Sequence, residues 1–168
     1  MKRLKPEDAF DKYHRAVFSF AYRMTRRADT AEDVTQECFL ALVRHPERFD
    51  STRGTVKTYL LAIARNLVLK NYRDTHGEDA LEDDGPTLSA DPRRALEVSF
   101  AVERAVATLP ALQQEALILF EYEGVSLEEI AQITGADTGT IKSRLHRARE
   151  RLRRALAPFR VRGIHGTV

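Results

Sequence analysis

The chain lacks the residues that build disulfide-bonded and metal-binding proteins. It has one cysteine, Cys38, so an internal disulfide and a multi-cysteine zinc site are both excluded. We expect Cys38 to be a small buried residue on a helix rather than a redox sensor. The five histidines are scattered along the chain, and no nucleophile constellation or phosphate-binding loop is visible. We therefore expect no catalytic residue, no metal site and no cofactor.

Long apolar runs are missing as well. No stretch approaches the roughly 20 apolar residues that a transmembrane helix needs. The basic start of the chain is followed by the acids Glu7 and Asp8, and the apolar core of a signal peptide is not found there. With 43% hydrophobic and 31% charged residues, the composition is that of a soluble globular protein. These features predict a cytoplasmic protein without membrane insertion.

Basic residues are absent from one internal segment. Between Asp74 and Asp91 there are seven acids and no Lys or Arg, and Gly77, Gly85 and Pro86 interrupt the segment. Low hydrophobicity with charge of one sign is typical of a flexible linker. We place this acidic linker at residues 75–92, with one domain at 1–74, a second at 93–158 and a tail at 159–168.

Helical periodicity extends through both predicted domains, and no strand-like alternation bounded by turns is found. The fold class is therefore expected to be all-α, with two small helical domains joined by the linker. Each domain buries a modest core and should be only marginally stable. The expected helices are one carrying Phe10, Tyr13, Val17, Phe20, Ala21 and Met24 on its apolar face, one capped by Asp29 or Thr30 and reaching about His45, one from Thr55 or Val56 to about Arg73, one marked by residues 96–106, and one from Pro110 to about Tyr122.

The segment from Gly139 to Arg149 is the most informative part of the sequence. Apolar residues at helical spacing form one stripe along it, made of Ile141, Leu145, Ala148 and Leu152. The residues that point away from this stripe or flank it carry positive charge or small hydrogen-bonding groups: Gly139, Thr140, Lys142, Ser143, Arg144, His146 and Arg147. Such a face is suited to contact base edges between two phosphate strands.

A short helix precedes this segment and completes a helix-turn-helix signature. Ser126 stands as an N-cap before acids, Gly135 ends the short helix, and Asp137 or Thr138 can cap the next one. The alternative is a helical hairpin whose basic face is merely solvated. The outward Gly139 favours DNA binding. A helical glycine costs about 1 kcal/mol relative to Ala, and it lets backbone N–H groups approach a phosphate.

The C-terminal segment is strongly basic. From Asp137 onward, Lys142 and eight arginines are opposed by only two acids, Asp137 and Glu150. A basic segment on an otherwise balanced chain indicates a polyanion as partner.

Motifs in both halves of the chain resemble those of bacterial RNA polymerase sigma factors. In the C-terminal half, the motifs that resemble sigma region 4 are Leu109-Pro110, Gly124-Val125-Ser126, Glu129-Ile130-Ala131 and the run from Gly139 to Arg149. In the N-terminal half, residues 31–40 and 59–66 resemble helices of sigma region 2. The likeness is to the small extracytoplasmic-function (ECF) class, which keeps only regions 2 and 4. It covers nearly everything from Phe10 to Leu156 apart from the linker.

The resemblance implies a promoter-specificity subunit that binds core RNA polymerase and promoter DNA, and that has an anti-sigma factor as a further partner. The residues implied to read the minus-thirty-five duplex are Thr138, Gly139, Thr140, Lys142, Ser143, Arg144 and Arg147. The loop before the third helix and that helix are implied to recognise the minus-ten element through Asp50, Ser51, Arg53, Gly54, Lys57, Thr58, Arg65 and Asn66. Tyr59 lies among these, but we expect it to be a core aromatic residue.

The second helix is implied to dock on the polymerase. Ala31, Val34, Cys38 and Ala41 fall on one side of it, and Asp33, Gln36, Glu37 and Leu40 fall on the other. An exposed Leu among polar groups is reasonable on a docking face, where an apolar anchor sits within a polar surround. The alternative is a solvent-exposed polar face that carries a single Leu without a binding role, which is common. Without the family resemblance we would prefer this alternative.

The sequence departs from the family pattern at three positions. Tyr59 stands where many relatives carry Trp, Lys70 where an acid is frequent, and Gln114 where Arg is frequent. The last change is expected to remove one phosphate contact. The tail from Arg160 to Val168 has no counterpart in the family, so phosphate contact and disorder both stay open as alternatives for Arg160 and Arg162.

Two other functions fit parts of the pattern. One is a helix-turn-helix regulator that acts at operators without joining polymerase, which would have no need of the docking face on the second helix. The other is a partner-switching protein that mimics a sigma factor to sequester an anti-sigma factor. It would bind no DNA, and the intact basic helix argues against it.

Overall fold

The computed structural model describes residues 5–77, 81 and 98–159, and the regular structure in these ranges is helical. The N-terminal half consists of α1 Pro6–Thr25, α2 Ala28–Arg44, the short 3-10 helix η1 Pro46–Arg48 and α3 Val56–His76. The C-terminal half consists of α4 Val98–Ala107, α5 Ala111–Leu117, the π-helical turn η3 Ile118–Tyr122, α6 Leu127–Thr134, α7 Thr138–Leu156 and η4 Ala157–Phe159. Within the described ranges, no helix combines the length and apolarity needed to cross a membrane.

Helix α1 begins and ends through standard local chemistry. Pro6 occupies its first turn, where a missing backbone N–H costs nothing, and the acids Glu7 and Asp8 lie beside the positive end of the helix dipole. At the other end Arg26 adopts a left-handed conformation with φ 57°, and its N–H donates to the carbonyl of Tyr22 at 2.7 Å. This arrangement satisfies one of the last carbonyls of the helix.

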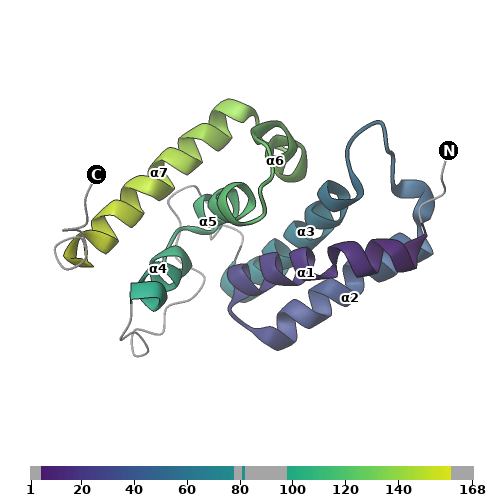
Figure 1. Ribbon diagram of the computed structural model, residues 1–168, viewed down its shortest axis with the longest axis horizontal. Coiled ribbons are helices and arrows are strands. Elements are labelled where there is room, and N and C mark those ends of the chain that lie inside the picture. The colour runs from purple at the N-terminus through teal and green to yellow at the C-terminus, as the bar shows by residue number, and fades with distance from the viewer. Residues whose placement is uncertain (1–4, 78–80, 82–97, 160–168) are drawn as a thin grey trace, which may run out of the picture.

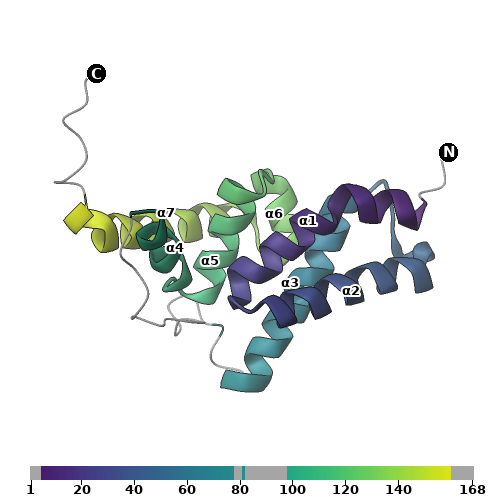
Figure 2. The same ribbon diagram turned by 60° about the horizontal axis from the view of Figure 1, so that its bottom comes forward.

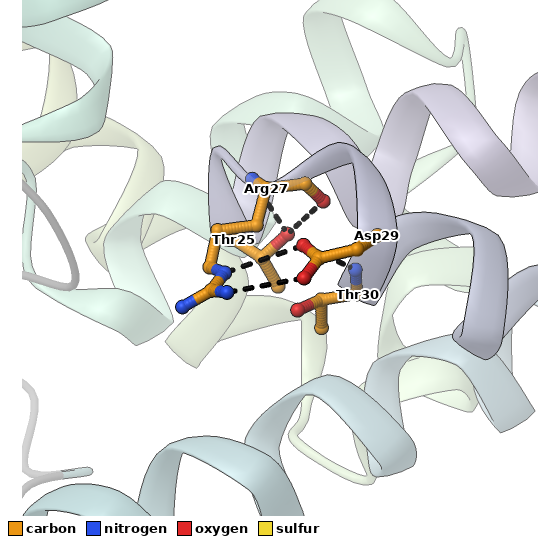
Figure 3. Close-up of polar contacts among 4 residues, drawn as sticks. All are labelled: Thr25, Arg27, Asp29 and Thr30. Atoms are coloured by element: carbon orange, nitrogen blue, oxygen red, sulfur yellow. Dashed lines mark hydrogen bonds and ion pairs between the residues drawn. The ribbon is translucent and has the colours of Figure 1, made fainter.

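The second helix starts earlier than the cap predicted at Asp29 or Thr30, as the turn between α1 and α2 shows (Figure 3). Helix α2 begins at Ala28, with Arg27 at the N-cap and no side chain capping it. Asp29 therefore lies in the first turn, where the helix dipole favours an acid. Its carboxylate accepts hydrogen bonds from the Arg27 guanidinium at 3.1 and 3.3 Å and from the Thr30 N–H at 2.9 Å. These bonds lower the pKa of Asp29, but the pair is exposed and adds little stability.

The third predicted helix corresponds to α3, and the fifth corresponds to α5 together with η3. Thr55 caps α3, because its hydroxyl accepts from the Thr58 N–H at 3.1 Å, and α3 runs three residues past the predicted end at Arg73. The predicted helix from Pro110 to Tyr122 is confirmed in extent. Its last turn is π-helical, and the Glu123 N–H donates to the Ile118 carbonyl at 3.0 Å.

The two halves pack against each other (Figures 1 and 2). Helices α1, α2 and α3 form one bundle, α5 and α7 pack together in the other half, and α6 lies against α3. One large cluster of buried side chains spans both halves, and its fully buried members include Phe20, Leu60, Ile118, Ile130 and Ile141. Truncating one such side chain to Ala typically costs about 2–5 kcal/mol.

Most of the predicted linker, and all of the tail beyond Phe159, lie outside the described residues. The first two residues of the predicted linker, Thr75 and His76, belong to α3. Leu81 is also described and packs against Tyr72 of α3 and Ala111 of α5.

Candidate nucleic-acid interface

Helix α6 of the helix-turn-helix begins with a reciprocal capping box. The Ser126 hydroxyl accepts from the Glu129 N–H at 3.2 Å, and the Glu129 carboxylate accepts from the Ser126 N–H at 2.9 Å. Gly135 ends α6 in the left-handed region at φ 75°, as predicted, and its N–H donates to the Ala131 carbonyl at 2.9 Å. An N-cap of this type contributes about 1 kcal/mol, so the sequence specifies the position of this short helix locally.

Asp137 caps helix α7. Its carboxylate accepts from the Thr140 N–H at 2.7 Å, and this backbone hydrogen bond is the main reason that the pKa of Asp137 is lowered. Gly139 follows on the exposed side of the first turn, but it has a structural role that the sequence did not indicate. A Cβ on Gly139 would lie 3.3 Å from an Asp137 carboxylate oxygen. The glycine therefore leaves room for the cap as well as exposing its backbone.

The two predicted faces of α7 are found. Ile141, Leu145 and Ala148 are buried and Leu152 is half-buried. Of the residues predicted to read duplex DNA, the exposed ones are Gly139, Lys142, Ser143 and Arg147, and the half-buried ones are Thr138, Thr140 and Arg144. The helix therefore presents positive charge and hydroxyl groups along one accessible side while its apolar stripe holds it on the domain.

Helix α2 also has the two predicted faces. Ala31, Val34 and Cys38 are buried, and the four predicted docking residues are exposed: Asp33, Gln36, Glu37 and Leu40. Burial raises the pKa of the Cys38 thiol to about 12, which fits the expected inert core cysteine.

Leu40 belongs to a larger apolar groove that the sequence did not reveal. The groove has a volume of ≈ 570 Å³, and Phe10, Phe39 and Val43 line it together with Leu40. Phe10 was predicted on the core face of the first helix, but it is 45% exposed. It lies edge-on to Phe39, with ring centroids 5.0 Å apart, where the start of α1 lies beside the end of α2. Exposed apolar surfaces of this kind are typical of interaction sites.

The loop between η1 and α3 is held by Asp50. Its carboxylate accepts from the Thr52 N–H at 2.9 Å and from the Thr52 hydroxyl at 2.6 Å, and these bonds lower its pKa. Asp50, Ser51 and Arg53 are exposed and Gly54 is half-buried. Tyr59 is half-buried at the edge of the core, where it packs edge-on against Phe49 with centroids 5.5 Å apart.

The remaining residues predicted to contact the minus-ten strand are not all on open surface. Asn66 is exposed, whereas Thr58 is buried. The Lys57 ammonium donates to the Glu123 carbonyl at 2.6 Å, and the Thr58 hydroxyl donates to the Glu129 carboxylate at 3.4 Å. These partners belong to the C-terminal half, and no local pattern in the sequence signals the pairing.

Arg65 forms a bidentate ion pair with the C-terminal half. Its guanidinium donates to both carboxylate oxygens of Glu115, at 2.9 and 3.1 Å. Glu115 is fully buried, and burial raises its pKa while the Arg65 charge opposes that rise. Losing one partner of such a buried pair typically costs about 3–5 kcal/mol.

Gln114, the residue that replaces the family's usual Arg, is also fully buried. Its side-chain amide donates to the Arg23 carbonyl at 3.3 Å. Lys70 is exposed.

Among the residues that the structure describes, no group of three or more His, Cys, Asp or Glu is placed to hold a metal ion.

Both halves of the chain are similar to known proteins. Residues 9–77 match the sigma-70 region 2 family and residues 99–152 match the sigma-70 region 4 family. The chain is 36% identical over 137 residues to the ECF RNA polymerase sigma factor EcfG of Rhodopseudomonas palustris, an alignment that covers 80% of this chain and 75% of that protein. It is 30% identical over 164 residues to the ECF RNA polymerase sigma factor SigW of Bacillus subtilis, covering 89% and 87%.

A solved structure extends the likeness to three dimensions. The sigma factor RpoE of Bartonella quintana, solved in complex with the anti-sigma factor NepR, is 28% identical and superposes with a TM-score of 0.68. The superposition covers 90% of this chain and 96% of that one.

Proposed function

Since the chain belongs to the ECF class of the sigma-70 family, we propose that it confers promoter specificity on bacterial RNA polymerase at transcription initiation. The observation that carries the proposal is the presence of both functional regions on one chain. The C-terminal half has an accessible basic helix-turn-helix, and the N-terminal half has a helix face on which Leu40 is exposed among polar side chains. The chain itself is not an enzyme in this proposal. The polymerase carries out the chemistry, and the complex works in the cytoplasm.

Helix α7 reads the minus-thirty-five duplex in this proposal. Its first two turns enter the major groove, as in other helix-turn-helix proteins. At least one of Ser143, Arg144 and Arg147 reads a base edge in this proposal, and Arg is well shaped for two hydrogen bonds to guanine. Lys142 holds a phosphate, and Thr138, Gly139 and Thr140 bring the helix N-terminus to the backbone. The exposure of the basic face and the burial of the opposite stripe support this orientation.

Helix α2 docks on the core polymerase. Leu40 is the apolar anchor, and Asp33, Gln36 and Glu37 surround it with polar groups. The groove beside Leu40, with Phe10 on its far wall, offers a pocket for an apolar side chain of the partner. Anchors that fill such pockets carry much of the binding energy of protein interfaces.

The loop at residues 50–54 and helix α3 recognise the minus-ten element as single-stranded DNA. Asp50, Ser51, Arg53 and Gly54 form the loop, and such a loop can hydrogen-bond the base edges that pairing hides in a duplex. Arg65 and Asn66 lie further along α3, with Lys57 and Thr58 at its start. Cations at these positions would follow the phosphates of the strand.

An anti-sigma factor is the proposed regulatory partner. The Bartonella quintana relative was solved with such a factor bound, and the superposition with it extends over nine-tenths of this chain. We extend that class of partner to this chain.

The test is reconstitution with core polymerase. The chain should be retained by core polymerase in a pull-down and should direct run-off transcription from a subset of genomic fragments. DNA binding without polymerase binding would mean a helix-turn-helix regulator. Binding of an anti-sigma factor without DNA binding or transcription would mean a sigma mimic.

A further inference from the structure

A hollow lies between the loop that precedes α3 and helix α6. Its volume is ≈ 450 Å³, which falls within the range of small-molecule sites. The loop and α6 approach each other beside it, since a Cβ on Gly54 would lie 3.4 Å from the amide oxygen of Gln132. The hollow therefore has one wall from the N-terminal half and one from the C-terminal half.

The less exposed part of the lining is aromatic and apolar. Phe49 and Tyr59 are half-buried and pack edge-on against each other, while Ala62 and the buried Ile133 complete this part. Burial raises the pKa of Tyr59, and the charge of Arg48 opposes that rise, so the phenol stays neutral at neutral pH. Aromatic side chains of this kind are surfaces on which a nucleobase stacks.

The exposed part of the lining is polar and carries a net positive charge. It includes the two cations Arg48 and Arg53 and one acid, Asp50. The Asp50 carboxylate already accepts two hydrogen bonds from Thr52. A guanidinium makes paired hydrogen bonds with a phosphate, so this edge of the hollow is suited to hold a phosphate group.

The wall formed by α6 supplies a group that can read a base edge. The exposed side chain of Gln132 carries both a hydrogen-bond donor and an acceptor, and it lines the hollow next to Ile133. Glutamine is one of the side chains that make paired hydrogen bonds with a base. A stacking surface, an amide and two arginines therefore surround one space.

We propose that this hollow is a binding site for a free nucleoside monophosphate or diphosphate. The base lies against Phe49 and Tyr59, its edge meets Gln132, and the phosphate reaches Arg48 and Arg53. The inference goes beyond the proposed function, because Arg48 and Gln132 have no part in the minus-ten contacts proposed above. A base with its phosphate could also come from a DNA strand held by the loop, but such a strand has no need of α6.

Titration of the isolated full chain with AMP, GMP, CMP and UMP tests the site, with proton–nitrogen NMR spectra as the readout. At least one nucleotide should bind saturably below about 1 mM, the upper end of ordinary substrate levels. The backbone signals that move should include those of Arg48 and Tyr59 on one wall and Gln132 on the other. Inorganic phosphate at the same concentration should leave the Tyr59 and Gln132 signals in place, because the base is what reaches them.

Two substitutions, one on each wall, should weaken nucleotide binding. We expect a loss of about tenfold for Arg48→Ala, which removes a hydrogen bond to a charged group, and of about fivefold for Gln132→Ala, which removes a neutral one. Both side chains are exposed, so the circular dichroism spectrum should be unchanged. The matched controls are Arg44→Ala on α2 and Glu128→Ala on α6, both exposed and outside the hollow. Their nucleotide affinity should equal that of the wild type.

Failure of all four nucleotides to bind saturably would overturn the site. If inorganic phosphate moved the same signals as the nucleotides, the hollow would be an anion contact without base recognition. Binding that Gln132→Ala does not weaken would place the base on the loop alone and remove the wall formed by α6. The source of the base is checked with a single-stranded oligonucleotide of minus-ten sequence, whose affinity should be the same for wild type and Gln132→Ala. An equal loss for the oligonucleotide would assign the hollow to DNA instead of a free nucleotide.

Discussion

Asp137 and Gly139 lie two residues apart at the start of α7, and the carboxylate of the first would make a tight contact with any side chain on the second. A Cβ at Gly139 would be 3.3 Å from the Asp137 oxygen, which itself accepts the Thr140 N–H at 2.7 Å. The glycine thus has two explanations, one in the helix cap and one in close approach to DNA. Both act at the same end of the helix.

Gly139→Ala separates the two explanations. Ala favours the helix by about 1 kcal/mol, and crowding of the cap opposes this gain, so we expect the free energy of unfolding to change by less than about 1 kcal/mol. Affinity for minus-thirty-five duplex DNA should fall, because the methyl group stands between the backbone and the phosphate. Urea denaturation and anisotropy binding check the two quantities. A large loss of stability with unchanged DNA affinity would leave the cap as the sole explanation.

Individual side chains of α7 should differ in how they lose affinity. Alanine at a base-reading position should cost about 1–3 kcal/mol at the preferred sequence and relax specificity there. We expect this for at least one of Ser143, Arg144 and Arg147. Alanine at Lys142 should weaken all sequences alike and flatten the salt dependence. The measurement is binding of each variant to a panel of single-base promoter variants at two salt concentrations. Uniform loss for every variant would make α7 a nonspecific basic anchor.

The docking surface on α2 should be separable from stability. Leu40→Ala combined with Glu37→Lys should weaken binding to core polymerase, because it removes the apolar anchor and reverses a neighbouring charge. Both side chains are exposed, so the helical circular dichroism spectrum should be unchanged. Phe10→Ala should also weaken binding if the groove is part of the interface. A matched control is Val102→Ala, an exposed apolar residue on α4. Titration of core polymerase with labelled chain checks the affinities, and equal affinity in all variants would remove the docking assignment.

Cys38 should be unreactive in the folded protein. It is fully buried, and its pKa is raised to about 12, so at neutral pH almost none of it is the nucleophilic thiolate. Alkylation with iodoacetamide at pH 7.5, followed by mass spectrometry, should be slow in buffer and fast in guanidinium chloride. Rapid labelling of the native protein would show that the α2 core opens readily.

Local chemistry in the sequence was enough to predict most of the helices and the buried stripe of α7. Caps at Thr55, Ser126 and Asp137 act within three residues of the helix they start. Likewise, the buried stripe of α7 repeats every three or four residues. Such signals depend on neighbours in the chain, so they can be read without a tertiary structure. The predicted cap at Asp29 was wrong because an acid is equally favourable one or two positions further into the first turn.

Only the tertiary structure decided which predicted surfaces lie open and which are covered. Arg65 and Glu115 are 50 residues apart, and Gln114 and the carbonyl it binds are 91 apart. Pairs at such distances leave no periodic trace in the sequence. The exposure of Phe10 has the same origin, because periodicity assigns it to the apolar side of α1 and only the packing of α1 beside α2 leaves it at the edge of a groove. Local interactions specified the helices, and the long-range contacts between them decided that this sigma factor folds with its two halves closed on each other.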